Sequence, residues 1–466
     1  LLSDDFKKES LFYMRTIAAI STPPGEGGIG IVRISGADAQ KIADQVFHSV
    51  SGKKIESLPG YTSLFGTVSD GKETFDQCVA SNFRAPKSYT GENVVELSCH
   101  GGPFLLRKLL SACYAAGARP AEPGEFTKQA FLNGKMDLTQ AESVMEMIGA
   151  KSEGAARAAR AGQSGKLHES ICKVKDELMD ATSHLAAWAD YPDDDVPQVD
   201  DEVLKKQLCD STDCLQKLYD GFGAGQVLCD GIDTVIVGRP NVGKSTLMNL
   251  LSGTQKSIVT AFAGTTRDIV EDTISLGGIP LHLADTAGLR ESSDPIEQIG
   301  VERTRERLNH AQLILAVFDS SESLTEEDQK LLQSIGNVPA VAVINKADLQ
   351  NKLDEEYISK YIKQKVYISA LKGEGIEALT DVIKTIFHTR EIDPSAGILF
   401  TERQKDVIRR ALECTKEARD AFLSGMTLDA VTVSVEGALS ALLEFTGERV
   451  TDTVVEEVFK NFCVGK

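Results

Sequence analysis

The sequence predicts a multidomain fold in which an α+β N-terminal domain precedes an all-α helical domain that carries an inserted α/β domain. The chain has 466 residues, enough for roughly three domains of ordinary size. β-prone segments broken by glycine and proline give way near Lys135 to apolar residues at helical spacing. Between about Gly231 and Arg390 strand and helix patterns alternate, and helical spacing then resumes.

The N-terminal domain is predicted to span 1–133. Short β-prone runs at Thr16–Ile20 and Ile29–Ser35 predict strands. A G-x-G-x-x-G pattern extends from Gly25 to Gly30, but a dinucleotide site needs a helix directly after it. The residues that follow are β-prone, so we exclude a Rossmann site. His100 stands before two glycines. A chemical role is one interpretation, but the position favours a turn residue.

The helical domain is predicted in two parts, 134–230 and 391–466. In the first part Leu138, Ala141, Met145 and Ile148 follow helical spacing, and alanine-rich sequence continues the pattern to Trp188. In the second part the same spacing links Val407, Ala411, Cys414 and Ala418, and then Val431, Val435, Ala438 and Leu442.

Two interruptions are predicted within the first helical part. The segment Asp190–Glu202 holds seven acidic residues and no basic one, which predicts a solvated loop between two helices. Gly221, Gly223 and Gly225 predict a flexible joint before the inserted domain at 231–390.

Composition excludes several classes of protein. The net charge of −19 repels phosphate backbones, so the chain is a poor candidate for binding nucleic acid by its overall charge. No apolar run approaches the length of a membrane span, and the first eight residues lack the apolar segment of a secretory signal. The nine cysteines contain no C-x-x-C pair and predict reduced thiols. We therefore expect a cytoplasmic protein.

A phosphate-binding loop is predicted at Gly238–Thr246 (GRPNVGKST), between the apolar strand Thr234–Val237 and a helix that begins near Leu247. Its glycines allow backbone N–H groups to surround a phosphate. The Lys244 ammonium can reach the terminal phosphates, and the Ser245 hydroxyl can bind Mg²⁺.

Three further motifs each follow a predicted strand. Asp285–Gly288 (DTAG) can present an aspartate to Mg²⁺ and a glycine to the last phosphate. Asn345–Asp348 (NKAD) ends an apolar strand, and its aspartate can accept hydrogen bonds from guanine N1–H and the amino group that adenine lacks. Ser369–Leu371 (SAL) suits a further guanine contact. The motifs in this order predict binding of GTP and Mg²⁺.

These motifs resemble those of the translation-factor-like GTPases, and Ala263–Asp268 (AGTTRD) resembles their switch I. The resemblance implies a P-loop, Ras-like G domain with Thr266 as a second magnesium ligand beside Ser245. Leu289 stands where Ras-type GTPases carry the glutamine that orients water, and no arginine finger is assignable. The nucleotide-binding residues implied are Asn241, Val242, Gly243, Lys244, Ser245, Thr246, Thr260, Ala261, Phe262, Ala263, Gly264, Thr265, Thr266, Asp285, Thr286, Ala287, Gly288, Asn345, Lys346, Asp348, Ser369 and Ala370.

Longer segments resemble the MnmE (TrmE) family of tRNA-modification GTPases. They are Ser21–Gly36, Ser88–Pro103, Arg119–Glu142, Leu283–Thr304 and the C-terminal Phe462–Lys466 (FCVGK), and together they extend over nearly the whole chain. The resemblance implies an N-terminal domain that binds folate and forms a homodimer, and a G domain inserted into a helical one.

The resemblance also implies site residues. A potassium ion replaces the arginine finger, held by Asn241, Thr260, Phe262 and Thr265. Glu297 orients the attacking water, although the residues alone indicate only a surface acid. A reduced folate, methylene- or formyl-tetrahydrofolate, is assigned to Arg33, Glu96, Lys135 and Lys466. Cys463 is either a nucleophile or redox group of the modification chemistry or a small buried apolar residue.

The activity implied by the resemblance is GTP hydrolysis in tRNA modification. An MnmG (GidA)-type flavoprotein that carries FAD would join the chain in a heterotetramer. The pair would add an aminomethyl or carboxymethylaminomethyl group to carbon 5 of the wobble uridine. Because the chain is acidic, tRNA binding would be shared with a more basic partner.

Two other classes of GTPase share the nucleotide motifs. An RNA-binding GTPase of ribosome assembly predicts a basic domain beside the G domain. A mechanical membrane GTPase predicts an apolar or polybasic membrane-binding element. The sequence shows neither feature, so we expect no membrane partner and keep the ribosome-assembly GTPase as the alternative.

Overall fold

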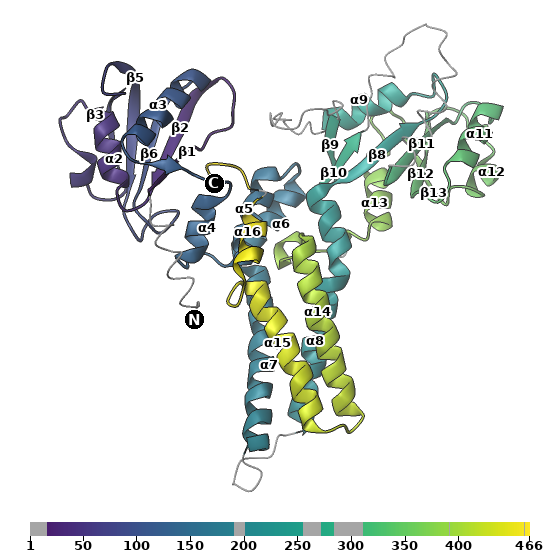
Figure 1. The fold of residues 1–466 in the computed structure, drawn as a ribbon. Helices are drawn as coiled ribbons and strands as arrows, with labels where there is room; N and C mark the ends of the chain where they lie inside the picture. Colours follow the sequence, from purple (N-terminus) through teal and green to yellow (C-terminus); the bar gives the residue numbers. More distant parts are fainter. Residues whose placement is uncertain (1–15, 191–200, 255–271, 284–310, 391, 461) are drawn as a thin grey trace. The chain divides into compact units, whose positions relative to one another are not determined.

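The computed structural model describes residues 16–190, 201–254, 272–283, 311–390, 392–460 and 462–466 (Figure 1). The chain forms two compact units. The first comprises Leu1–Met145 and Ser440–Lys466, and the second comprises Glu146–Leu439. The boundaries expected at 133, 230 and 390 stay predictions.

The first unit is built on a seven-stranded sheet with the order β3-β4-β5-β6-β2-β1-β7. Its strands are β1 Ile17–Ile20, β2 Gly27–Ser35, β3 Phe47–Ser49, β4 Thr62–Ser69, β5 Thr74–Phe83, β6 Val94–Gly101 and β7 Arg119–Pro120. Helices α2 (Ala39–Val46) and α3 (Pro103–Ala115) pack on the sheet (Figure 1). The G-x-G-x-x-G segment runs into β2 rather than a helix, which confirms the strand predicted there.

Alternation along the strands decides which side chains enter this core. Val32 and Ile34 on β2 and Leu97 on β6 are buried in the apolar cluster that includes residues of α2 and α3. Arg33 lies between Val32 and Ile34, and Glu96 directly precedes Leu97. Because successive side chains of a strand point to opposite faces, Arg33 and Glu96 project from the other face of the sheet. This opposite face carries two of the four charged residues assigned to the folate, Arg33 and Glu96.

The C-terminal tail belongs to the same unit. Helix α16 (Asp452–Lys460) contacts α4 (Glu125–Leu132), and Val464 forms a β-bridge with Pro123. Gly124 has a φ of +67°, and a Cβ there would lie 2.9 Å from the Phe459 carbonyl oxygen, so glycine permits the close approach. The last residues of the chain are thereby fixed beside the sheet.

The second unit contains long helices and the inserted sheet. The helices outside the insertion are α6 Glu153–Gln163, α7 Lys166–Asp190, α8 Asp201–Asp230, α14 Glu402–Leu423 and α15 Leu428–Thr446, the last of which continues into the first unit. The alanine-rich pattern is helical as predicted, but it is divided among α5 (Leu138–Gly149), α6 and α7. Ser152 caps α6 by accepting from Ala155 N, and Gly165 precedes α7 with a φ of +81°.

The predicted flexible joint at Gly221–Gly225 is wrong, because α8 runs without interruption from Asp201 to Asp230. A Cβ on Gly225 would lie 2.6 Å from the main-chain oxygen of Leu399, so this glycine allows two backbones to approach closely. Packing against residues far away in the sequence therefore maintains the helix across its glycines. Residues 191–200 of the predicted acidic loop lie outside the described residues.

The inserted part is an α/β sheet with the order β13-β12-β11-β8-β10-β9, parallel except for β9. Its strands are β8 Ile232–Val237, β9 Asp272–Leu276, β10 Ile279–Leu283, β11 Leu313–Asp319, β12 Ala340–Asn345 and β13 Gln364–Tyr367. Its helices are α9 Lys244–Thr254, α11 Glu326–Ser334, α12 Glu355–Ser359 and α13 Ile376–Ile386. The parallel strands β8, β11 and β12 end at the same edge, which therefore collects the loops that follow them.

The structure bears on the cysteines and on membrane-spanning segments. All nine cysteines are free thiols. Within the described ranges, no helix combines the length and apolar character that crossing a bilayer requires.

Candidate functional site

The phosphate-binding loop connects β8 to α9, as predicted. Gly238, Asn241 and Gly243 have positive φ angles of +152°, +66° and +96°, so the loop makes turns that glycine and asparagine tolerate best. The Lys244 Nζ donates to the main-chain oxygens of Gly238 and Arg239 at 2.6 and 2.8 Å. Burial lowers the pKa of Lys244. A phosphate near this ammonium would stabilise its charged form.

The NKAD and SAL motifs meet the phosphate-binding loop at a cavity of about 300 Å³ at the same sheet edge. Its lining combines the phosphate-binding loop with the NKAD and SAL motifs: Gly243, Thr246, Asn345, Lys346, Asp348, Leu349, Ser369, Ala370 and Leu371. The structure thus brings these three motifs together around one cavity.

Asn345 connects the three motifs through its side chain. Its Nδ2 donates to the main-chain oxygen of Val242 at 2.9 Å, and its Oδ1 accepts from Ala370 N at 3.1 Å. Asp348 Oδ1 accepts from Ser369 Oγ at 2.8 Å. This hydrogen bond is the main cause of the lowered pKa of Asp348, which keeps the carboxylate ionised as an acceptor for N–H donors.

Several predicted residues lie outside the described part of the chain. These are Thr260, Ala261, Phe262, Ala263, Gly264, Thr265, Thr266, Asp285, Thr286, Ala287, Gly288 and Glu297. Of the magnesium ligands, the structure describes Ser245, exposed in the first turn of α9. Of the residues predicted to bind potassium, it describes Asn241, exposed in the phosphate-binding loop. An exposed hydroxyl and an amide oxygen are oxygen ligands of the kind that hard cations accept.

A second cluster lies on the face of the first unit's sheet opposite α2 and α3. Arg33 on β2 is paired with Glu96 on β6, with Nη2–Oε1 and Nε–Oε1 distances of 2.8 and 2.9 Å. Arg33 Nη1 also lies 3.4 Å from the main-chain oxygen of Gly465. Three of the four residues assigned to folate therefore meet here, because Lys466 directly follows Gly465.

Aromatic side chains complete this cluster. The Arg33 guanidinium lies 5.4 Å from the ring centre of Tyr89 and 5.6 Å from that of Phe126, and the Lys466 Nζ lies 5.9 Å from the Tyr89 ring. Burial, followed by the charge of Arg33, lowers the pKa of Lys466. Two cations beside aromatic rings and a carboxylate can hold a planar, anionic ligand.

Lys135 and Cys463 occupy the surroundings of this cluster. The Lys135 Nζ donates to the main-chain oxygen of Pro86 at 3.1 Å, in the loop that carries Tyr89. The main-chain oxygen of Cys463 accepts from Gly124 N and Lys466 N, each at 3.3 Å, and its side chain is partly buried. The structure thus places both residues in this unit without joining either side chain to the Arg33–Glu96 pair.

His100 is not the turn residue that the sequence predicted. It lies in β6, and its Nδ1 is 2.6 Å from Asp76 Oδ1 on β5. Strand β6 continues through His100 to Gly101. His100 therefore lies beside the Asp76 carboxylate of the neighbouring strand.

The structure brings three residues into these sites that the sequence analysis did not identify. Tyr89 and Phe126 contact Arg33, and the Tyr89 hydroxyl lies 2.8 Å from Thr127 Oγ1. Asp319 ends β11 and pairs with Lys346 of the NKAD motif. The available signal for Asp319 was a lone acid at the end of an entirely apolar strand (LILAVFD). No comparable local signal marked the two aromatic residues.

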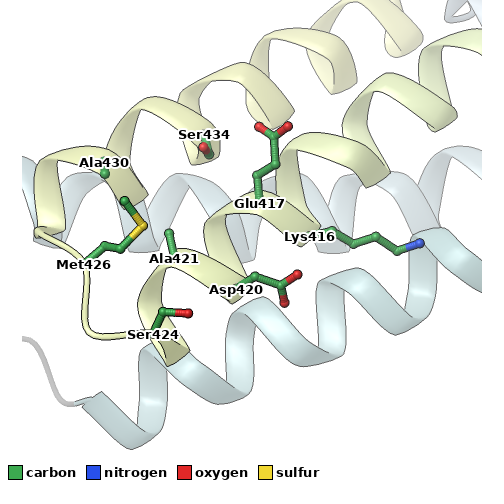
Figure 2. A pocket seen from close by; sticks show the side chains of 8 residues that line it. All are labelled: Lys416, Glu417, Asp420, Ala421, Ser424, Met426, Ala430 and Ser434. Carbon is green, nitrogen blue, oxygen red and sulfur yellow. The ribbon is translucent and has the colours of Figure 1, made fainter.

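A larger cavity of about 470 Å³ lies where α14 ends and α15 begins (Figure 2). Lys416, Glu417 and Asp420 line it together with small side chains and Met426, and none of the predicted site residues does. Among the described residues there is also no group of three His, Cys, Asp or Glu side chains suited to a metal ion. The nucleotide and Arg33–Glu96 clusters are therefore the candidate functional sites.

Two family models match successive parts of this chain. The family described as the GTP-binding protein TrmE N-terminus matches residues 16–135, and the family described as the MnmE helical domain matches residues 138–463. Among solved structures, Era in complex with MgGDPNP and nucleotides 1506-1542 of 16S ribosomal RNA is 32% identical. That match covers 39% of this chain and 66% of the Era chain, with a TM-score of 0.26.

Curated relatives match over almost their entire length. The tRNA modification GTPase MnmE of Clostridioides difficile (strain 630) is 39% identical over 98% of this chain and 100% of the relative. The proteins of the same name from Heliobacterium modesticaldum and Lactococcus lactis subsp. lactis are each 41% identical over 97% of this chain, and 99% and 98% of the relatives. The chain therefore belongs to the MnmE (TrmE) family of tRNA modification GTPases.

Proposed function

We propose that this chain is a potassium-activated, cytoplasmic GTPase that acts on tRNA together with an MnmG (GidA)-type flavoprotein. The pair adds an aminomethyl or carboxymethylaminomethyl group to carbon 5 of the wobble uridine, with a folate one-carbon unit as the carbon source. The observation that carries this proposal is the 39–41% identity to MnmE proteins over nearly the full length of both chains. Similarity confined to a G domain would equally suit a ribosome-assembly GTPase.

The nucleotide cavity supports binding of GTP. The Asp348 carboxylate, held by Ser369, offers acceptors for the two N–H groups of guanine that adenine lacks. Lys244 and Ser245 lie where the sequence motif requires a phosphate contact and a magnesium ligand. The proposed magnesium site adds Thr266.

The proposed potassium site consists of Asn241 with Thr260, Phe262 and Thr265. A bound potassium ion would offset the negative charge that develops during phosphoryl transfer, the task of an arginine finger in other GTPases. Asn241 suits this role because its left-handed backbone, with φ of +66°, presents a short amide side chain in the phosphate-binding loop. Glu297 is proposed to orient the attacking water.

The Arg33–Glu96 cluster supports binding of a reduced folate. The Arg33 and Lys466 cations suit the carboxylates of the glutamate tail, the Glu96 carboxylate suits N–H donors of the pterin, and Tyr89 offers an aromatic face. Lys135 is proposed as a further contact from the neighbouring loop. Cys463 is proposed to take part in the modification chemistry.

The proposed assembly is a homodimer that joins the flavoprotein in a heterotetramer. FAD would be bound by the partner. The net charge of −19 supports shared tRNA binding, because an acidic surface attracts phosphate backbones poorly.

The proposed domain boundaries remain 1–133, 134–230, 231–390 and 391–466. GTP hydrolysis in the inserted domain is proposed to drive a conformational cycle.

Nucleoside analysis of tRNA tests this function. The chain is incubated with the flavoprotein, methylenetetrahydrofolate, GTP, K⁺, unmodified tRNA and either glycine or an ammonium salt as the nitrogen donor, and the nucleosides are then separated by mass spectrometry. We expect modified wobble uridine only when every component is present. Arg33→Ala should abolish modification but retain GTP hydrolysis, whereas Lys244→Ala should abolish both. Unmodified uridine with an active partner would refute the function without refuting the GTPase.

A further inference from the structure

We propose that Asp319, the last residue of β11, is a positioning residue of the nucleotide site that sets guanine-nucleotide affinity by holding the Lys346 side chain against the base cavity. The inference rests on GTP binding by this chain but not on tRNA, folate or the flavoprotein. Asp319 belongs to none of the sequence motifs that contact nucleotide, and it acts through Lys346 rather than on the ligand.

Asp319 is a buried carboxylate whose two oxygens both have partners. Its side chain is 3% exposed, and its Oδ2 lies 2.5 Å from the Lys346 Nζ. Its Oδ1 accepts from the main-chain N and the Oγ of Ser321 at 2.9 and 2.7 Å. Both oxygens of the carboxylate are therefore engaged by the protein, and the group holds a cation from a buried position.

The electrostatic surroundings of Asp319 favour a charged pair. Burial works to raise the pKa of Asp319, but hydrogen bonds from Lys346 and Ser321 outweigh it, and the pKa lies below its ordinary value. A buried carboxylate that stays ionised attracts its cation more strongly than a surface acid does.

Lys346 is the residue through which Asp319 reaches the nucleotide. Lys346 lines the base cavity together with Asn345 and Asp348, and its side chain is 36% exposed. Its backbone has a φ of +59°, an uncommon conformation for a lysine that its surroundings must stabilise. With the ammonium fixed on Asp319, the aliphatic stem of Lys346 is fixed as a wall of the cavity.

Hydrogen bonds from the residue after Asp319 hold the main chain of the NKAD motif. Asp319 and Asn345 are register partners at the ends of β11 and β12. Ser320 N donates to the main-chain oxygen of Asn345 at 3.0 Å, and Ser320 Oγ donates to that of Lys346 at 2.7 Å. These bonds place the Lys346 backbone, and the Asp319 carboxylate then selects the direction of its side chain.

Lys346 also links the base cavity to the phosphate-binding loop. Its Nζ lies 3.3 Å from the main-chain oxygen of Asn241, so one ammonium contacts both the end of β11 and the loop after β8. If the Asp319 charge were lost, this ammonium would have the Asn241 carbonyl and water as partners. The stem would then be free to leave the position that contacts the base.

The test is the affinity of the full chain for N-methylanthraniloyl GDP, measured by fluorescence in one fixed potassium buffer. Asp319→Asn keeps the size of the side chain and removes its charge, and we expect the Kd to rise roughly tenfold or more. The matched control is Glu355→Gln on α12, which removes an ion pair with Lys365 (3.0 Å) on the edge strand β13. Its Kd should stay within about twofold of the original value.

A double-mutant cycle with Lys346→Gln separates positioning from general stability. If Asp319 acts through Lys346, the double variant Asp319→Asn/Lys346→Gln should bind no more weakly than Lys346→Gln alone. If the factors by which the two single substitutions raise the Kd multiply in the double variant, the proposal is overturned. An Asp319→Asn variant that unfolds at lower urea concentration but binds with unchanged Kd would also overturn it. Because the cycle compares affinities for nucleotide alone, its result does not depend on whether tRNA is modified.

Discussion

Arg33 and Glu96 are directly opposed residues of β2 and β6, and both Arg33 nitrogens that contact the carboxylate lie on the same oxygen, Oε1. The pair thus leaves the other oxygen, Oε2, to accept hydrogen bonds from a ligand. Because Tyr89, Phe126 and Lys466 surround Arg33, this ion pair is the centre of the proposed folate site rather than an isolated surface contact.

Glu96→Gln should weaken binding of 5-formyltetrahydrofolate roughly tenfold or more, because the change removes the charged acceptor proposed for the pterin N–H groups. Equilibrium dialysis measures the affinity. Lys108→Gln is the control, since Lys108 pairs with Asp70 at 3.5 Å in the same unit and has no proposed part in the site. Equal folate affinity of Glu96→Gln and the unaltered protein would contradict the assignment.

Folate affinity should also fall as the pH rises, and the cause should be Lys466. Burial and the nearby Arg33 lower its pKa, so the ammonium loses its charge at a lower pH than an ordinary lysine. Below that pKa the cation attracts the folate carboxylates, and above it the attraction is lost. Lys466→Arg stays charged and should flatten the profile measured by dialysis. A profile identical in both proteins would assign the titration to another group.

GTP hydrolysis should be roughly ten to a hundred times faster in potassium chloride than in sodium chloride at equal ionic strength. A potassium ion held by Asn241 would offset charge in the transition state, and the smaller sodium ion would fit the same ligands poorly. Phosphate release measures the rates. Asn241→Ala should remove the difference between the two salts, while equal rates in the unaltered protein would rule out the cation site.

Asp348→Asn should change which base the site accepts. The carboxylate held by Ser369 accepts from two guanine N–H groups, whereas an amide can donate to the oxygen that xanthine carries in place of the amino group. GDP affinity should fall about a hundredfold or more, and affinity for xanthosine diphosphate should rise. Competition against a fluorescent nucleotide measures both. Retained preference for GDP would show that another residue reads the base.

Gly225→Ala should lower the free energy of unfolding by about 1–3 kcal/mol, because the new Cβ would lie 2.6 Å from the Leu399 main-chain oxygen. Gly223 lies in the same helix, and a Cβ added there would meet no atom of the surrounding structure within 4 Å. Gly223→Ala should therefore stabilise the chain by about 0.5–1 kcal/mol. Urea unfolding followed by circular dichroism measures both. A similar effect of both changes would contradict the packing explanation.

Much of the nucleotide site was predictable because its chemistry is local. The phosphate-binding loop, NKAD and SAL each occupy consecutive residues at the end of an apolar strand, and parallel strands bring their ends to one edge. Asp319 was not predicted, because its significance depends on its ion pair with Lys346, which directly follows the next strand, β12. Tyr89 and Phe126 were missed for the same reason, since nothing in their neighbouring sequence indicates that both contact Arg33.

The sequence by itself determined the family, the fold class and the order of the nucleotide motifs, because these depend on residue type and spacing along the chain. Only the tertiary structure decided that α8 continues through Gly221–Gly225 and that His100 lies in a strand beside Asp76. Local patterns favour a joint and a turn at these positions. Contacts with the Leu399 backbone and with β5 decide otherwise, because packing and hydrogen bonds between distant segments outweigh weak local preferences.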